Sequence, residues 1–151
     1  MKEKIAVSAC LVGKNTKYNG QNNDNLWVKK YLQNKEYILI CPEVAGGLPV
    51  PRLPSERYQD LVINQKKQDV TSYFKKGAMK TLNELLQQNI HVLILKSNSP
   101  SCGYQTIYDG SFSKRIIKGN GVFVELALHY HFKIYTEKDI EMMMKKNQNS
   151  F

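Results

Sequence analysis

Near the start of the chain lies the run Lys4-Ile5-Ala6-Val7-Ser8-Ala9-Cys10, a short apolar segment that ends at a cysteine. The same pattern recurs twice further along. Tyr37-Ile38-Leu39-Ile40 ends at Cys41, and residues 91–96 lead into the loop that contains Cys102. Short apolar runs of this length are typical of buried β-strands. We therefore predict three buried strands, each followed by a cysteine.

Amphipathic helical patterns alternate with these strands. Apolar residues recur at helical spacing in four segments. The first two are Trp27, Val28, Tyr31 and Leu32 after a capping Asp24, and Phe74, Ala78, Leu82 and Leu85 after Thr71. The last two are Val122, Phe123, Leu126 and Tyr130, and Ile140, Met143 and Met144 after the capping pair Thr136 and Asp139. A fourth strand is predicted at residues 132–135. The alternation predicts an α/β fold that is Rossmann-like, with a largely parallel sheet and helices on both faces.

Two segments do not fit the alternation. Residues 42–56 hold four of the five prolines and the Gly46-Gly47 pair, so we predict no regular structure there. Short hairpins are expected at residues 61–70 and at residues 104–113, the second around the Asp109-Gly110 turn.

Composition limits the class of protein. The 151 residues are 42% hydrophobic and carry a formal net charge of +9, which suits one globular domain spanning residues 1–151. No apolar run approaches the roughly 20 residues that cross a bilayer, and no secretory leader is evident. We expect a cytoplasmic protein without a membrane partner. The positive charge favours a nucleic acid, an anionic small molecule or merely a solvated surface.

The three cysteines are expected to converge. Cys10 and Cys41 directly follow predicted strands, and Cys102 lies in the loop after a third. Because the carboxyl ends of parallel strands share one edge of a sheet, where ligands commonly bind, residues far apart in sequence can meet there. An odd number of cysteines in a cytoplasmic protein does not suggest disulfides and favours metal binding or thiol chemistry.

Three chemistries are open at this point. A zinc site usually has four ligands and a closely spaced cysteine pair, which this chain lacks. A cysteine nucleophile needs a histidine, but His91 is expected at the opposite end of its strand, and His129 and His131 do not share a helical face. An iron–sulfur cluster held by three thiolates would leave one iron open to act as a Lewis acid.

Polar residues near the cysteines are candidates for the chemistry. Glu43 lies two positions after Cys41 and could serve as a general acid or base, and Ser101 precedes Cys102 with a hydroxyl. Lys96 closes a predicted strand and could attract an anionic or polar substrate. Arg52, with Glu56 and Arg57, belongs to or follows the proline-rich segment and could bind substrate or form ion pairs.

Three blocks carry a family resemblance. They read Ser8-Ala9-Cys10-Leu11-Val12-Gly13, then Cys41-Pro42-Glu43-Val44-Ala45-Gly46-Gly47-Leu48-Pro49-Val50-Pro51-Arg52, then Ser99-Pro100-Ser101-Cys102-Gly103 with Tyr108-Asp109-Gly110. Gly77-Ala78 belongs to a weaker middle block. In this order the blocks resemble the bacterial thiouracil desulfidases, small single-domain iron–sulfur proteins formerly classed as a domain of unknown function. The resemblance covers nearly the whole chain.

The resemblance implies a cofactor and roles for individual residues. It implies a [4Fe-4S] cluster held by Cys10, Cys41 and Cys102, with one open iron that binds the substrate sulfur. It implies that Glu43 is the catalytic carboxylate and Ser101 the hydroxyl beside the cluster. The reaction would replace C=S by C=O and release sulfide without net redox change.

From these observations we expect an enzyme, a desulfidase of a thiolated pyrimidine of the 2- or 4-thiouracil type. Its substrate would be the free base or a nucleotide, with a thiolated base in tRNA as an alternative. Lys96 and Arg52 are expected to bind the substrate. The rival hypothesis is a non-catalytic structural or sensor domain that binds zinc or an iron–sulfur cluster.

Overall fold

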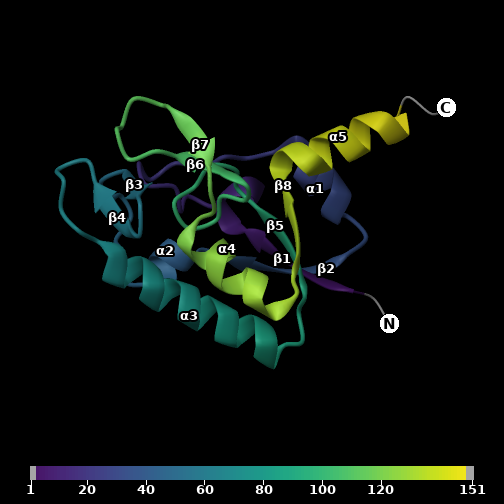
Figure 1. Cartoon of the computed structure of the whole chain (residues 1–151). Helices are drawn as coiled ribbons and strands as arrows, with labels where there is room; N and C mark the ends of the chain where they lie inside the picture. The colour runs from purple at the N-terminus through teal and green to yellow at the C-terminus, as the bar shows by residue number, and fades with distance from the viewer. Residues whose placement is uncertain (1–2, 149–151) are drawn as a thin grey trace.

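A four-stranded parallel sheet forms the centre of the computed structural model, which describes residues 3–148 (Figure 1). Its strands, in spatial order, are β2 (Glu36–Ile40), β1 (Lys4–Ser8), β5 (Val92–Leu95) and β8 (Lys133–Thr136). The register pairs Ala6 with Ile38 on one side and with Leu93 on the other. The predicted α/β fold with a largely parallel sheet is confirmed.

Helices cover both faces of this sheet (Figure 1). They are α1 (Leu26–Leu32) and α5 (Glu137–Gln148) on one face, and α3 (Thr71–Gln87) and α4 (Val122–Ala127) on the other. Since successive strand residues point to opposite faces, Val7 packs with Val28 of α1, whereas Ala6 packs with Leu82 of α3. The predicted placement of helices on both faces is therefore correct.

Strand order determines where a ligand site can form. The chain leaves β1 for β2 on one side and later enters β5 on the other side of β1. This reversal creates a crevice outside the carboxyl ends of β1 and β5, the usual place for ligands in open α/β sheets. Cys10 and Cys102 follow these two strands.

The proline-rich segment contains regular structure, contrary to the prediction for residues 42–56. Helix α2 (Pro42–Ala45) begins directly after Cys41, with Pro42 in its first turn, where the missing backbone N–H costs nothing. Strand β3 (Ser55–Tyr58) then pairs with β4 (Leu61–Asn64). The predicted turn-back within residues 61–70 is present, since β4 bridges antiparallel to Asp69 and Val70 N donates to the Val62 carbonyl at 2.9 Å. The prediction missed β3, the longer partner of β4.

The second hairpin is also longer than predicted. It pairs β6 (Thr106–Tyr108) with β7 (Ile116–Lys118), so the turn spans residues 109–115 rather than the Asp109-Gly110 pair alone. All three residues of β7 are exposed, which explains why the sequence shows no buried-strand pattern there.

Helix starts follow the expected chemistry with one correction. Thr136 and Asp139 form the predicted cap of α5, with Asp139 Oδ2 accepting from Thr136 N at 2.8 Å and Thr136 Oγ1 accepting from Asp139 N at 3.3 Å. The cap of α1 is Asn25, not Asp24, because the Asn25 side chain accepts from the Val28 backbone.

Short 3₁₀ helices follow β1 (η1, Ala9–Val12) and α4 (η2, Leu128–Tyr130). Within residues 3–148, no helix combines the length and apolarity needed to span a bilayer.

Candidate functional site

A cavity of about 440 Å³ opens at the carboxyl edge of the sheet. Most of the side chains that the sequence singles out line it, namely Cys10, Cys41, Cys102, Glu43, Ser101, Arg52, Lys96 and Glu56. Arg57 does not, because its guanidinium forms an ion pair with Glu125 and donates to the Asn120 carbonyl. The lining side chains come from turns that follow β1, β2 and β5, from the segment between α2 and β3, and from β3 itself. A volume of this size suits a small organic ligand.

The three cysteines reach the cavity from separate turns. Cys10 lies in η1 directly after β1, Cys41 is the residue before α2, and Cys102 is in the turn after β5. All three are free thiols; Cys10 and Cys41 are half-buried and Cys102 is buried. The structure thus brings together residues separated by as many as 92 positions in the sequence.

Hydrogen-bond donors surround the sulfurs. Asn23 Nδ2 donates to Cys10 Sγ at 3.4 Å, and Ser101 Oγ lies 3.6 Å from Cys102 Sγ. The Ser8 hydroxyl also interacts with Cys102, and the backbone N–H groups at the start of α2 are directed at Cys41. Donors in this arrangement stabilise sulfur that carries negative charge.

Burial disfavours the negatively charged thiolate form of the three cysteines as long as no cation is bound beside them. Desolvation raises the pKa of Cys10, Cys41 and Cys102 above that of an ordinary thiol, most strongly for fully buried Cys102. The Cys41 thiol adds to the pKa rise of both its neighbours through like charge. A bound cation would reverse this balance, because coordination to a metal deprotonates a thiol.

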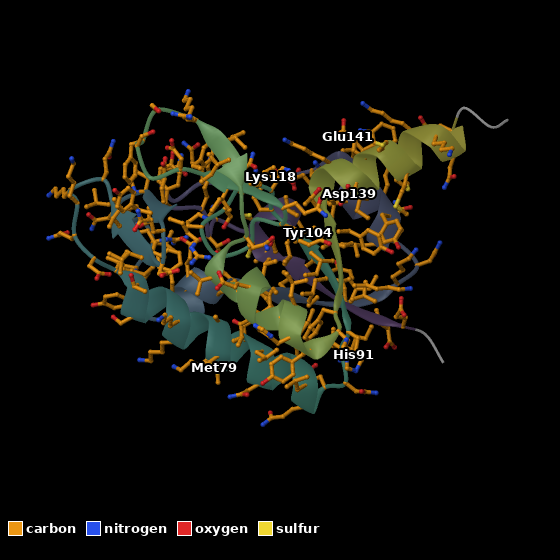
Figure 2. All side chains as sticks on the ribbon, in the orientation of Figure 1. Met79, His91, Tyr104, Lys118, Asp139 and Glu141 are labelled. Atoms are coloured by element: carbon orange, nitrogen blue, oxygen red, sulfur yellow. The ribbon has the colours of Figure 1, made fainter. Side chains whose placement is uncertain are left out.

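The ligand geometry bears on the zinc alternative. Among residues 3–148, no three His, Cys, Asp or Glu side chains are grouped closely enough to hold one metal ion. His91 cannot complete such a site, because it lies beside the end of α3 at the amino end of the sheet and bonds to Asn89 (Figure 2). None of the three histidines lines the cavity.

Glu43 and Ser101 contact each other directly. Ser101 Oγ donates to Glu43 Oε2 at 2.7 Å, although 58 positions separate the two residues. Arg52 Nε donates to the other carboxylate oxygen, Oε1, at 3.1 Å. The Glu43 carboxylate is therefore fixed at both oxygens beside the cysteines.

Arg52 and Lys96 line the cavity, but their charged groups also have protein partners. Besides Glu43, the Arg52 guanidinium donates to the Thr16 carbonyl at 2.9 Å and to the Pro49 carbonyl at 3.3 Å. Lys96 Nζ lies 3.4 Å from Glu137 Oε2 and donates to the Ser97 carbonyl at 3.0 Å. In this arrangement Arg52 orients Glu43, and Lys96 sits close enough to Cys10 to lower the pKa of its thiol slightly against the larger effect of burial.

A contact between two glycines positions the start of α2. A side chain carbon on Gly77 of α3 would lie 1.8 Å from the Pro42 carbonyl oxygen, and one on Gly46 would lie 2.0 Å from the Tyr73 carbonyl oxygen. Any residue larger than glycine at either position would therefore overlap with the backbone of the other helix. The two glycines therefore bring α2, with Cys41 and Glu43 at its start, directly against α3.

Sequence reasoning missed several residues of the site. Ser99 Oγ accepts from the backbone N–H groups of Ser101 and Cys102, at 3.2 and 3.0 Å, and shapes the turn that presents both. Asn23 contacts a cysteine, and Tyr108 and Phe112 line the cavity. Ser99 in the Ser-Pro-Ser-Cys block and Tyr108 in the Tyr-Asp-Gly motif could have been identified from their positions, whereas Asn23 and Phe112 gave no such signal.

Comparisons with known proteins agree on one relationship. A family model described as 2-thiouracil desulfurase matches residues 5–139. The uncharacterized protein YbbK of Bacillus subtilis (strain 168) is 34% identical over 146 residues, which cover 90% of this chain and 97% of that protein. The solved structure of the [4Fe-4S]-dependent thiouracil desulfidase TudS is 36% identical, covers 97% of this chain and 99% of its own, and superposes with a TM-score of 0.86.

Proposed function

The chain belongs to the 2-thiouracil desulfurase family, whose model matches residues 5–139, and from this premise we propose that it is a [4Fe-4S]-dependent desulfidase. The proposed reaction converts the thiocarbonyl of a thiolated pyrimidine to a carbonyl. Water supplies the oxygen and the sulfur leaves as sulfide, so that C=S and H₂O give C=O and H₂S. These atoms balance without any electron donor or acceptor.

The cysteines fit the cluster that the similarity to TudS suggests. Cys10, Cys41 and Cys102 would hold it, since thiolates are the usual ligands of iron–sulfur clusters. A cluster binds its thiolates on separate irons, and the three sulfurs reach one cavity from separate turns. The donors directed at the sulfurs support the same assignment. When bound, the cluster supplies an iron without a protein ligand, which is a Lewis acid for a soft thiocarbonyl sulfur.

Glu43 and Ser101 are proposed to move the protons. Glu43 Oε2, which faces Ser101, takes a proton from the water that attacks the thiocarbonyl carbon. It then returns the proton to the leaving sulfur. Arg52 donates a hydrogen bond to Oε1 and so holds the Glu43 carboxylate in one orientation during the reaction. Ser101 donates a hydrogen bond that holds Oε2, or the substrate once it is bound, beside Cys102.

One observation carries this proposal, the 2.7 Å contact between Glu43 and Ser101 in a cavity that three free cysteines share. A metal-binding sensor without turnover has no need for a carboxylate oriented in this way. A hydrolytic desulfidase needs a proton carrier within reach of its substrate, and the geometry suits that need.

The substrate proposed is a free thiolated pyrimidine or its nucleotide. The cavity of about 440 Å³ would hold both the cluster and the substrate. Lys17, Lys96, Lys114 and Arg52 line it and would favour a phosphate-bearing form. Substrate binding by Lys96 and Arg52 stays a prediction. A thiolated base in tRNA is the alternative, and its use would fall steeply with salt concentration.

The test is turnover by protein purified without oxygen. With 2-thiouracil and no added reductant, we expect uracil and sulfide in equal amounts. The matched control is the same protein after removal of its iron, which should form neither product. Iron-loaded protein that binds thiouracil but forms no uracil would overturn the proposed function.

A further inference from the structure

The tip of the β6–β7 hairpin forms part of the cavity wall, and the proton transfers proposed above use none of its residues. The tip spans residues 109–115 and lies beside β3, as Figure 1 shows. It contributes Phe112 and Lys114 to the cavity, and Tyr108 lines the cavity at the end of β6. The cysteines and Glu43 line the same cavity.

A carboxylate on β3 holds this tip in place. Glu56 Oε1 accepts hydrogen bonds from the backbone N–H of Gly110 at 3.0 Å and of Phe112 at 3.1 Å. Gly110 packs so tightly on β3 that a side chain carbon there would lie 2.8 Å from the Arg57 carbonyl oxygen. One oxygen of Glu56 thus connects the hairpin tip to β3 across 54 and 56 positions of sequence.

The tip holds two large residues in a costly conformation. Phe112 has a φ of 57° and Lys114 a φ of 65°, in the left-handed region that side chains disfavour. The Asp109 side chain accepts from Ser111 N at 2.9 Å, and Asp109 N donates to the Arg115 carbonyl at 3.0 Å, which closes the tip. The bonds from Asp109 and Glu56 therefore fix the backbone on both sides of Phe112.

We propose that Phe112 is the specificity-determining residue that stacks on the flat ring of the pyrimidine, and that Glu56 is the residue that positions it. The inference rests on the proposed function. Iron and a carboxylate act on any thiocarbonyl group, so selection of a heteroaromatic ring needs a separate contact. Aromatic side chains supply such a contact because every nucleobase has a flat face that can stack.

Two pairs of variants test the assignment. Phe112→Ala should raise KM for 2-thiouracil about 10- to 100-fold, the range of one lost base–aromatic stack, with kcat changed less than about threefold. Phe112→Tyr keeps the ring and should retain the wild-type KM. Tyr130→Ala is the matched control, since Tyr130 is an exposed aromatic residue in η2 that does not line the cavity.

Glu56 is tested with a readout that does not depend on turnover. Glu56→Ala removes the acceptor, so amide hydrogen exchange at Gly110 and Phe112 should accelerate at least tenfold, and KM should rise in parallel with that of Phe112→Ala. Glu56→Gln keeps a side chain oxygen and should preserve both values. Iron content should stay unchanged in every variant, since neither residue contacts a cysteine.

The outcomes separate the two proposals. If wild-type protein forms uracil but Phe112→Ala keeps its KM, the stacking role is wrong and the proposed function stands. If exchange at Gly110 and Phe112 is unchanged in Glu56→Ala, Glu56 does not position the tip. If iron-loaded wild-type protein forms no uracil, the proposed function fails, and the stacking of a pyrimidine fails with it.

Discussion

Ser101 donates a hydrogen bond of 2.7 Å to Glu43, and this bond connects the turn after β5 to the first turn of α2. Each residue also lies close in sequence to a cysteine of the cavity, since Ser101 directly precedes Cys102 and Glu43 is two positions after Cys41. The groups proposed to move protons therefore belong to the same two turns as two of the three proposed cluster ligands, Cys41 and Cys102. Any displacement of one turn affects both functions.

Replacing Glu43 by glutamine tests the proton carrier. Glu43→Gln keeps the shape of the side chain and an oxygen for Ser101, but it cannot take a proton from water. We expect uracil formation to fall about 100- to 10,000-fold, the range typical of general acid–base catalysis. Iron content should not change.

The matched control for this variant is Glu36→Gln. Glu36 is exposed at the amino end of β2, at the other end of the sheet, and its substitution should leave both activity and iron content unchanged. Full activity in Glu43→Gln would contradict the role of Glu43.

Arg52 is expected to act through Glu43. Arg52→Lys keeps the charge but cannot bond to Glu43, Thr16 and Pro49 at once, because an ammonium lacks the fork of the guanidinium. We predict that kcat falls about tenfold or more while iron content is unchanged. Lys80→Arg is the control, since Lys80 is exposed on α3 and does not line the cavity. A rise in KM alone would instead assign Arg52 to direct substrate binding.

The contact between α2 and α3 gives a prediction that combines stability with cofactor content. Gly77→Ala places a methyl group where the Pro42 carbonyl lies and must push α2 away from α3. We expect a loss of about 1–3 kcal/mol in the free energy of unfolding, as for overpacked interiors. Lower iron content should accompany it, because Cys41 moves with α2.

Urea unfolding and iron analysis measure the two effects of Gly77→Ala. Lys76→Ala, at the neighbouring exposed position of α3, should change neither. Wild-type stability in Gly77→Ala would show that the helices separate without cost.

Much of the fold and the site could be predicted from the sequence because the signals are local. The runs before Cys10 and Cys41 are short and apolar, and a parallel sheet brings their ends to one edge. The hydrogen bond between Glu43 and Ser101 could not be predicted, since it depends on side chain directions in two distant turns.

Other features depend on contacts that no local pattern reveals. The close approach of Gly46 and Gly77 is a contact between two helices, although both glycines stand in the motifs quoted from the sequence. Helix α2 was missed because the prolines and glycines of residues 42–56 suggest irregular structure, whereas Pro42 lies in the first helical turn, which tolerates proline. Phe112 was missed because its place in the cavity depends on the hydrogen bond that its backbone N–H donates to Glu56.

Removal of the cluster should expose a dependence of stability on pH. Burial raises the pKa of all three thiols, so the folded chain keeps these protons to higher pH than the unfolded chain. Above about pH 8.5, where unfolded thiols ionise, the unfolded state has lost protons that the folded state retains. The free energy of unfolding of cluster-free protein should therefore fall as pH rises from about 8 to 10.

Urea titrations at several pH values measure this slope. Cys102→Ser removes the most deeply buried thiol and should make the decline shallower than in wild-type protein under the same conditions. A stability that is flat or rises over this range would contradict the assigned direction of the pKa shifts.

The central claim is that the three converging thiols hold an iron–sulfur cluster. It is tested most directly by measuring iron and acid-labile sulfide per chain in protein purified without oxygen. We predict about four of each in wild-type protein and a marked loss when Cys10, Cys41 or Cys102 is replaced by serine. Protein that holds zinc and takes up no iron even after anaerobic reconstitution would contradict the account.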